Sequence, residues 1–269
     1  MYNNRTNKTT THFSKVRSLM DASKIFEGYA KDYTAGRPDY AFELIGFMYG
    51  EGGISMASAV ADIGSGTGKF ARHLIEKGSE VYCVEPSSDM RQTAEKELSR
   101  YPNFHSVKGD AEHSNLEDGS VDFVTTAQAF HWFDVDLFRA ECKRILRHGG
   151  KVFLIWNMRG ESDALNKEMH EIYEKYCPDF RGFNGGIKKD DERIKRFFVN
   201  GYDYVSFDHP LSLNRETFIA RSLSGSYSLQ QGDKDFDEYM SAIEGVFEKN
   251  AVDGMVTIAN MSVAYSGTL

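Results

Sequence analysis

The stretch VADIGSGTGKFARHL (60–74) places three glycines at alternate positions between an apolar run and a helical pattern. Gly64, Gly66 and Gly68 follow the apolar AVADI, and Asp62 stands just before them. Glycines let the main chain come close to a ligand, and the N-terminus of the helix that follows offers free N–H groups. The spacing therefore predicts a ligand-binding loop.

Two well-known loop types fit this spacing poorly. A phosphate-binding loop GxxxxGK[ST], read back from Gly68-Lys69, would need a glycine in place of Ile63 and a hydroxyl in place of Phe70. A dinucleotide fingerprint GxGxxG would need its third glycine at Lys69, which weakens a dehydrogenase assignment without removing it. What remains is an acid followed by glycines at every second position.

This pattern is similar to the first motif of class I S-adenosylmethionine-dependent methyltransferases. Two further acids follow expected strands. Glu85 ends EVYCVE, where a carboxylate could hold two ribose hydroxyls, and Asp110 ends FHSVKGD, where a carboxylate could accept from an adenine amino group. Because open α/β sheets bind ligands at the carboxyl ends of their strands, we expect Asp62, Glu85 and Asp110 to share one edge.

The resemblance extends over about residues 25 to 157. The segment FEGYAKDYTAGRPDY (26–40) looks like the aromatic and Arg-Pro segment that precedes the fold in the small-molecule, type 11 branch of the family. That branch includes quinone-biosynthesis and trans-aconitate methyltransferases. VDFVTTAQAFHWFD (121–134) looks like its fourth strand with a His-Trp-Phe signature, and ILRHGGKVFLIW (145–156) matches its helix, double glycine and fifth strand.

The resemblance implies S-adenosylmethionine as cofactor and S-adenosylhomocysteine as product. The residues that it places around the methionine part of the cofactor are Asp62, Gly64, Ser65, Gly66 and Gly68. Those that it places at the ribose and adenosine are Glu85, Pro86, Ser87, Met90, Asp110 and Ala111. It further implies that Gln128 and Ala129 lie beside the sulfonium, and that a lid over the cofactor is formed by Tyr29, Tyr33 and Arg37.

The acceptor side is expected after the fourth strand. His131 is the candidate general base, which is needed only for an acceptor that is protonated at its working pH. Trp132 and Phe133 are candidates for contact with the acceptor, and their ring faces could also attract the sulfonium. Asp134 is expected to cap the next helix rather than to take part in the chemistry. We expect no metal, because the cysteines and histidines form no ligand cluster.

The periodicity of the apolar residues and the positions of the turn residues predict an α/β fold. We expect a Rossmann-like, seven-stranded and mostly parallel sheet with helices on both faces and an antiparallel final strand. The expected strands are 59–63, 80–85, 104–110, 121–130, 151–156, 202–213 and 255–267. The expected helices are 69–78, 87–100, one from Asp134 to the Gly149-Gly150 stop, and 236–250. We expect a polar tail (1–20) and a single domain (21–269), with an N-terminal lid (21–57) and a helical cap (about 158–200).

Composition limits the class of partner. The net charge of −8 argues against a protein that binds nucleic acid through its phosphates, and no apolar run is long enough to span a membrane. The odd number of distant cysteines favours reduced thiols and a cytoplasmic protein. We therefore expect a small-molecule methyl acceptor, with oxygen, carbon or nitrogen as the methylated atom. The alternatives are a protein or nucleic-acid methyltransferase, and a regulatory protein that binds the cofactor without turnover.

Overall fold

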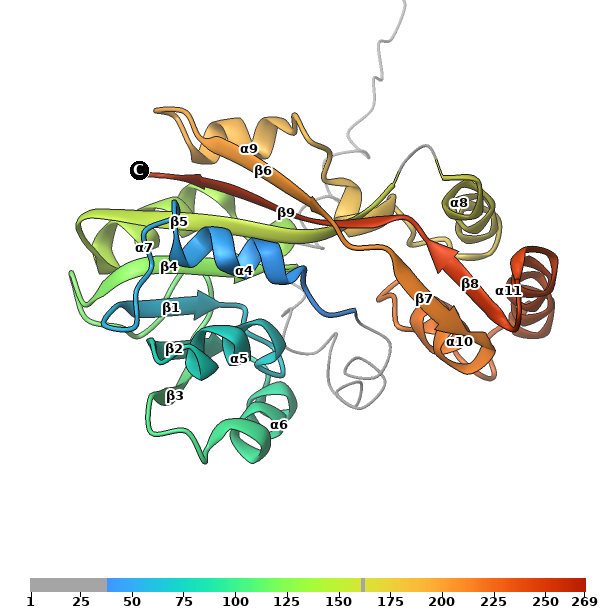
Figure 1. The fold of residues 1–269 in the computed structure, drawn as a ribbon, viewed down its shortest axis with the longest axis horizontal. Helices are drawn as coiled ribbons and strands as arrows, with labels where there is room; N and C mark the ends of the chain where they lie inside the picture. Colours follow the sequence, from blue (N-terminus) through green and yellow to red (C-terminus); the bar gives the residue numbers. More distant parts are fainter. Residues whose placement is uncertain (1–37, 161–162) are drawn as a thin grey trace, which may run out of the picture.

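The structure is a computed structural model that describes residues 38–160 and 163–269. The predicted tail and the first part of the predicted lid lie outside these ranges. The described part of the chain is a layered α/β fold with a second group of elements at one end (Figure 1).

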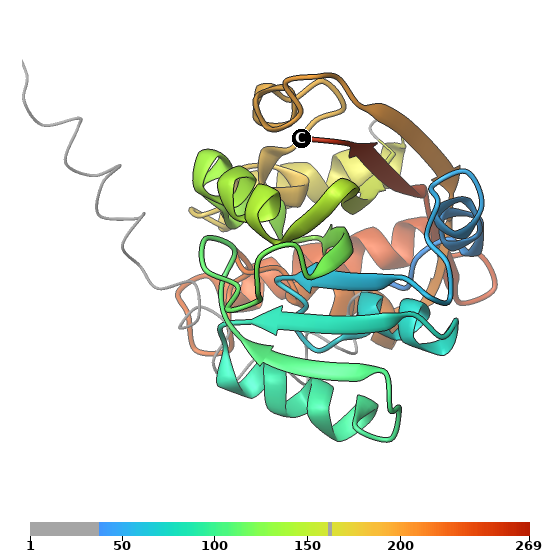
Figure 2. The same cartoon turned by 90° about the vertical axis from the view of Figure 1, so that its left-hand side faces the viewer.

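A seven-stranded sheet forms the centre of the molecule. Its strands are β1 (Ala59–Ile63), β2 (Glu80–Glu85), β3 (Phe104–Lys108), β4 (Val121–Ala127), β5 (Leu146–Arg159), β6 (Asp203–Asp208) and β9 (Asn260–Gly267). They lie in the order β3-β2-β1-β4-β5-β9-β6. Strands β1 to β5 pair in parallel, whereas β9 runs antiparallel to β5 and β6. In Figure 2 the arrows of β1, β2 and β3 lie side by side and point the same way. The predicted sheet with an antiparallel final strand is confirmed.

Helices cover both faces of this sheet, because its central strands are apolar on both sides. One face packs against α4 (Phe42–Tyr49) and α5 (Lys69–Glu76), with α6 (Ser88–Leu98) beside them. The opposite face packs against α7 (Val135–Ile145) and α9 (Glu192–Phe197). Helix α5 buries the side chains that the sequence predicts for its apolar face, which are Phe70, Ala71, Leu74 and Ile75.

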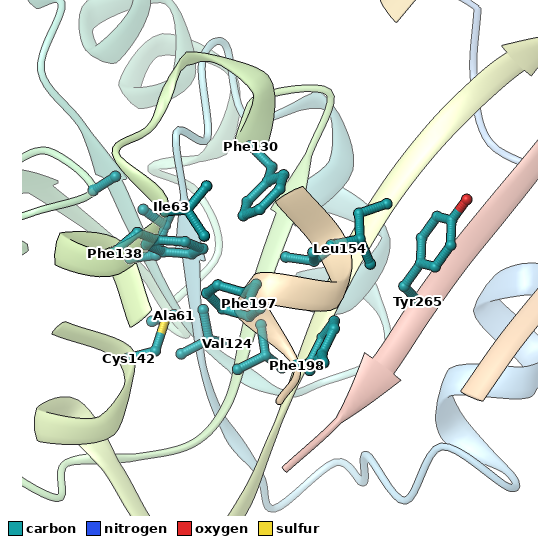
Figure 3. Packing of buried hydrophobic residues seen from close by; sticks show 14 of the residues in the cluster. Ala61, Ile63, Val124, Phe130, Phe138, Cys142, Leu154, Phe197, Phe198 and Tyr265 are labelled. Carbon is teal, nitrogen blue, oxygen red and sulfur yellow. The ribbon is translucent and has the colours of Figure 1, made fainter. Parts of the chain in front are cut away.

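An aromatic cluster fixes α7 and α9 against the sheet (Figure 3). The rings of Phe138 and Phe197 are stacked, with centroids 5.2 Å apart and an interplanar angle of 20°. Phe130 meets the ring of Phe197 edge-on at 5.4 Å, and Trp156 meets Phe130 in the same manner at 6.0 Å. Such offset and edge-to-face pairs add to the free energy of burial. The cluster therefore ties the end of β4 to the helices behind it.

A second group of elements lies beyond the carboxyl ends of the parallel strands. It consists of α8 (Ala164–Tyr176), η2 (Phe183–Gly186), β7 (Leu211–Asn214), α10 (Arg215–Leu223), α11 (Phe236–Asn250) and β8 (Met255–Ile258). Strands β7 and β8 pair antiparallel, and their apolar side chains pack with those of the three helices in one core. In Figure 1 the arrow of β1 points toward the side on which this group lies. The predicted cap range contributes only α8 and η2 to it.

Several predicted boundaries are wrong for identifiable reasons. Segment 202–213 is divided into β6 and β7, and segment 255–267 into β8 and β9, because in each case the chain passes from one sheet to the other. Strand β4 ends at Ala127, since Gln128 has a φ of +59°. Helix α7 ends before the double glycine, because Leu146 already pairs with Val121 of β4.

Candidate functional site

The glycine loop joins β1 to α5 and is folded against the end of β2. Its first two N–H groups, those of Gly64 and Ser65, donate to the carbonyl oxygen of Val84 at 2.9 and 3.1 Å. A side chain at Gly64 would collide with Ala129, whose Cβ would be 2.7 Å away. At Gly66, by contrast, a Cβ would meet no atom within 4 Å. The middle glycine is therefore the point where bare main chain borders open space.

A pocket opens over this loop at the carboxyl ends of β1, β4 and β5. The predicted site residues that line it are Asp62, Gly64, Ser65, Gly66 and Gln128. Its other lining residues are Pro38, Tyr40, Thr67, Lys69, Phe70, Ala127 and Asn157. The predicted loop and the predicted end of β4 thus meet in one hollow.

Asp62 is the most deeply buried carboxylate of the site, with 1% of its surface exposed. Thr125 is its neighbour across β1 and β4, and the Thr125 hydroxyl donates to Asp62 Oδ1 at 2.7 Å. The other oxygen, Oδ2, is buried and has no hydrogen-bond partner among the described residues. Burial raises the pKa of Asp62 to about 7; the Thr125 hydrogen bond lowers it and the charge of Glu85 raises it further.

Glu85 ends β2 and bridges two loops. Its Oε2 accepts from the N–H of Gly66 and its Oε1 from the N–H of Ser87, both at 2.9 Å. Burial raises the pKa of the Glu85 carboxyl, and these two hydrogen bonds oppose the rise. Arg91 donates to the carbonyl oxygens of Glu85 and Pro86 at 2.8 Å and so fixes the turn after the strand.

Asp110 lies at the same edge but takes a different position. It is exposed and follows β3 by two residues, and its Oδ1 accepts from the N–H groups of Glu112 and His113 at 3.0 and 2.7 Å. Ala111 beside it is buried. The register of β1, β2 and β3 brings Asp62, Glu85 and Asp110 to one edge of the sheet, although Asp62 alone of the three lines the pocket.

The remaining predicted cofactor residues flank this centre. Gly68 is the N-cap of α5, Ser87 is the N-cap of α6, and Met90 is buried on α6. Pro86 lies between Glu85 and Ser87 in the turn that Arg91 holds. The predicted lid residues Tyr29, Tyr33 and Arg37 lie outside the described residues.

The chain turns sharply where β4 ends. The N–H of Gln128 donates to the carbonyl oxygen of Ile155 at 2.9 Å, which holds a non-glycine residue at a positive φ. Backbone strain of this kind is often found at functional sites. The short helix η1 (Phe130–Trp132) follows, and Asp134 caps α7 by accepting from the N–H groups of Asp136 and Leu137. The predicted capping role of Asp134 is confirmed.

The acceptor-side candidates lie in η1 and directly after it. Gly185 of η2 packs so closely on His131 that a side chain there would lie 2.5 Å from the ring. Trp132 is 42% exposed, and its ring centroid lies 5.1 Å from that of His131. Phe133 is partly buried and packs edge-on against Phe138 at 4.9 Å. The structure therefore separates an exposed Trp132 from a Phe133 that packs against the core.

Sequence reasoning missed several pocket residues from outside the glycine loop, among them Tyr40, Phe70 and Asn157. Tyr40 packs edge-on against Phe70 at 5.0 Å, and both rings line the pocket. Asn157 also lines it and directly follows the apolar run KVFLIW. A polar residue after a buried parallel strand is the same signal that identified Asp62 and Glu85, so Asn157 could have been found in the same way.

Known proteins resemble this chain in sequence. A family model described as a methyltransferase domain matches residues 61–154, which include Asp62, the glycine loop, Glu85 and His131. An uncharacterised methyltransferase of Schizosaccharomyces pombe is 31% identical over 201 residues, which cover 74% of this chain and 76% of that protein. The chain belongs to the class I, type 11 methyltransferase family.

Another relative and a solved structure are also similar to this chain. An uncharacterised methyltransferase of Mycobacterium tuberculosis is 37% identical over 155 residues, which span 58% of this chain and 61% of that relative. A crystal structure of a candidate methyltransferase from an antibiotic biosynthesis pathway of Anabaena variabilis shares the fold, with a TM-score of 0.59 and 21% identity. That match covers 87% of this chain and 99% of the solved one.

Across residues 38–160 and 163–269, none of the protein's helices combines the length and apolarity needed to cross a bilayer. Within the same ranges, no group of three or more His, Cys, Asp or Glu side chains is placed to hold a metal ion.

Proposed function

We propose that this protein transfers a methyl group from S-adenosylmethionine to a small organic acceptor. The observation that carries the proposal is the buried, unpartnered Oδ2 of Asp62 in the pocket bordered by Gly66. A buried carboxylate oxygen without a donor is costly, so a ligand that brings a donor gains affinity there. The family assignment supports a sulfonium nucleoside as that ligand.

The groups around the pocket fit such a ligand. Asp62 Oδ2 is an acceptor for the ammonium group of an amino-acid tail. The open space at Gly66 admits the ligand against the main chain. Each oxygen of Glu85 accepts one N–H and keeps a further lone pair, which suits the two hydroxyls of a ribose.

When bound, S-adenosylmethionine supplies a methyl group on a positively charged sulfur. The contribution of the chain is to orient the cofactor and the acceptor and to enclose them. Asp62 and the glycine loop would hold the amino-acid end of the ligand, and Glu85, which accepts from the Gly66 N–H beside the pocket, would hold its ribose. The turn at Gln128 brings the end of β4 to the pocket. Alignment of this kind supplies several orders of magnitude in rate.

The acceptor would approach from the side of His131, over which η2 closes. His131 would take the proton of an acceptor that is neutral and protonated, and a carboxylate acceptor would need no such base. The net charge of −8 supports a small acceptor rather than nucleic acid.

Because His131 is the proposed base, we expect that His131→Ala lowers kcat for a phenol while the affinity for S-adenosylhomocysteine stays the same.

The test begins with ligand binding to the full chain. S-adenosylmethionine and S-adenosylhomocysteine should raise its Tm, and NAD should not. Transfer of labelled methyl should then be measured with carboxylate, phenol and quinone acceptors, and in parallel with DNA, tRNA and protein. A rise in Tm with NAD alone would contradict the proposed cofactor. Label found only in macromolecules would contradict the proposed acceptor class, and binding without transfer to any acceptor would favour a regulatory protein.

A further inference from the structure

A buried polar pair joins two neighbouring strands at the edge of the pocket. Asn157 of β5 and Ser262 of β9 stand opposite each other in the strand register, and only 4% and 0% of their surfaces are exposed. Their neighbours Trp156 and Val263 are fully buried apolar residues. A carboxamide and a hydroxyl at this depth are unfavourable unless their hydrogen bonds are satisfied.

The partners of this pair come from a segment far away in the sequence. The Ser262 hydroxyl donates to Asn157 Oδ1 at 2.6 Å and accepts from the N–H of Ala41 at 2.8 Å. Asn157 Nδ2 donates to the carbonyl oxygen of Asp39 at 2.9 Å. We call residues 38–41 the strap. One continuous relay of three hydrogen bonds therefore holds the main chain of the strap against β5 and β9.

The strap in turn forms part of the pocket. Pro38 and Tyr40 line it together with the glycine loop. The strap precedes the segment 61–154 that matches the family model. Beyond the relay, Asp39 Oδ1 lies 2.6 Å from Nε2 of His73 on α5. Asp39 is thus fastened to α5 through its side chain and to β5 through its carbonyl oxygen, and Ala41 is fastened to β9.

We propose that Asn157 and Ser262 are positioning residues that set one wall of the cofactor pocket by holding the strap. This inference rests on the proposed function, since it concerns the same pocket. Ser262 itself does not line the pocket, so its effect on the ligand passes through Pro38 and Tyr40. Asn157 does line the pocket and serves both as a link in the relay and as part of the wall.

Loss of the Ser262 hydroxyl would leave the N–H of Ala41 without an acceptor in a buried place. A buried N–H without a partner is unfavourable, so the strap would move toward water to satisfy it. Helix α4, which starts one residue later, would stay in place because Leu44, Ile45 and Met48 are buried against the sheet. We therefore expect a folded protein with a loosened pocket wall.

The decisive variant is Ser262→Ala, with Ser266→Ala as its matched control. Ser266 is buried in the same strand and on the same face, but it stands opposite Phe153, far along β9 from the strap. Asn157→Asp provides a second variant, because it keeps the acceptor for Ser262 and replaces the amide donor by an oxygen facing the Asp39 carbonyl. Each variant is assayed for Tm, for the Kd of S-adenosylhomocysteine by calorimetry, and for hydrogen exchange of a peptide spanning 38–48.

Ser262→Ala should weaken the Kd by about fivefold, the equivalent of one lost neutral hydrogen bond. It should also accelerate exchange over the strap in the absence of ligand. Asn157→Asp should do the same, and Ser266→Ala should do neither. The double variant Asn157→Ala and Ser262→Ala should lose no more affinity than Asn157→Ala alone, because both act through one relay.

Either of two affinity results would overturn the inference: wild-type affinity in folded Ser262→Ala, or additive losses in the double variant. Exchange over the strap that is the same in Ser262→Ala and Ser266→Ala would overturn it as well. This exchange comparison needs no ligand, so it separates the relay from the proposed function. A wild-type protein that binds no S-adenosylhomocysteine would refute the cofactor, while the exchange data would still decide whether the relay holds the strap.

Discussion

The main-chain N–H of Gly66 donates a 2.9 Å hydrogen bond to Oε2 of Glu85. This contact joins the loop after β1 to the end of β2 and leaves Oε1 to accept from Ser87. The carboxylate is therefore oriented by main-chain donors from two loops before any ligand arrives. Groups fixed in this way bind a ligand with little further loss of conformational entropy.

Glu85→Ala should weaken the binding of S-adenosylhomocysteine by about 1–3 kcal/mol, because a charge-assisted hydrogen bond to the ribose is lost. Isothermal titration calorimetry measures the change. Glu80→Ala is the matched control, since it removes a carboxylate from the exposed start of the same strand. Equal affinities of Glu85→Ala and the wild type would remove Glu85 from the site.

Gly66→Val should abolish cofactor binding and leave the protein folded. A Cβ at this position meets no protein atom within 4 Å, and the new side chain enters the space proposed for the ligand. Its φ of +55° adds backbone strain of roughly 1–3 kcal/mol. Gly119, in the turn before β4, has a φ of +59° and equally open surroundings. Gly119→Val is therefore the control, and it should show the backbone strain without the loss of cofactor binding. Urea denaturation and calorimetry on both variants test this, and retained binding in Gly66→Val would contradict it.

Asp62 should make both stability and cofactor affinity depend on pH. Its folded pKa of about 7 lies above its ordinary value of 3.8, so between these values the folded state holds a proton that the unfolded state has lost. The contribution of Asp62 to the free energy of unfolding is therefore complete below pH 3.8, and it is lost as the pH rises to about 7. The loss is at most about 1.4 kcal/mol per pH unit.

Asp62→Asn isolates this effect. The free energy of unfolding of the variant relative to the wild type should increase from pH 4 to pH 7. Cofactor affinity of the wild type should rise over the same range, because the ammonium of the ligand favours the carboxylate, and the variant should lack that rise. Glu85 and Cys83 also interact with Asp62, but burial keeps the pKa of the Cys83 thiol well above this range. Parallel pH profiles of the variant and the wild type would rule out the role of Asp62.

Phe197→Ala should lower the free energy of unfolding by about 3–5 kcal/mol, because it leaves a cavity between Phe130 and Phe138. Urea denaturation measures this loss. Val199→Ala, two residues further on and 61% exposed, should change stability by less than about 0.5 kcal/mol. A small effect of Phe197→Ala would mean that the aromatic cluster does not fix η1 and α9.

Local patterns in the sequence predicted the first strands of the sheet and the helix after the glycine loop well. The apolar runs of β1 and β2 and the amphipathic α5 lie within one or two residues of their expected places, because burial in a parallel sheet leaves a strong signal. The glycine loop and Glu85 meet as expected because both follow parallel strands. The roles expected for Tyr29, Tyr33 and Arg37 stay predictions.

The sequence could not predict contacts between distant segments. The ring centroids of Tyr173 on α8 and Tyr239 on α11 are 6.3 Å apart. The sequence of each helix shows that it has an apolar face, but it does not show which other helix packs against that face. The same holds for the strap, since the Ala41 N–H and the Ser262 hydroxyl are 221 residues apart in the chain. A hydrogen bond from a main-chain group leaves no mark in the residue types.

Residues 209–259 leave the large sheet and return to it at a single point. The N–H of His209 donates to the carbonyl oxygen of Asn260 at 2.8 Å, and Asn260 Nδ2 donates back to the carbonyl oxygen of His209 at 3.2 Å. The two ends of this excursion are thus as close as the two sides of a hairpin turn. Segment 209–259 could therefore be replaced by another segment without altering β1 to β4, because insertions whose two ends lie close together are well tolerated. Any replacement would have to cover α8, which loses its α11 neighbour when the excursion is removed.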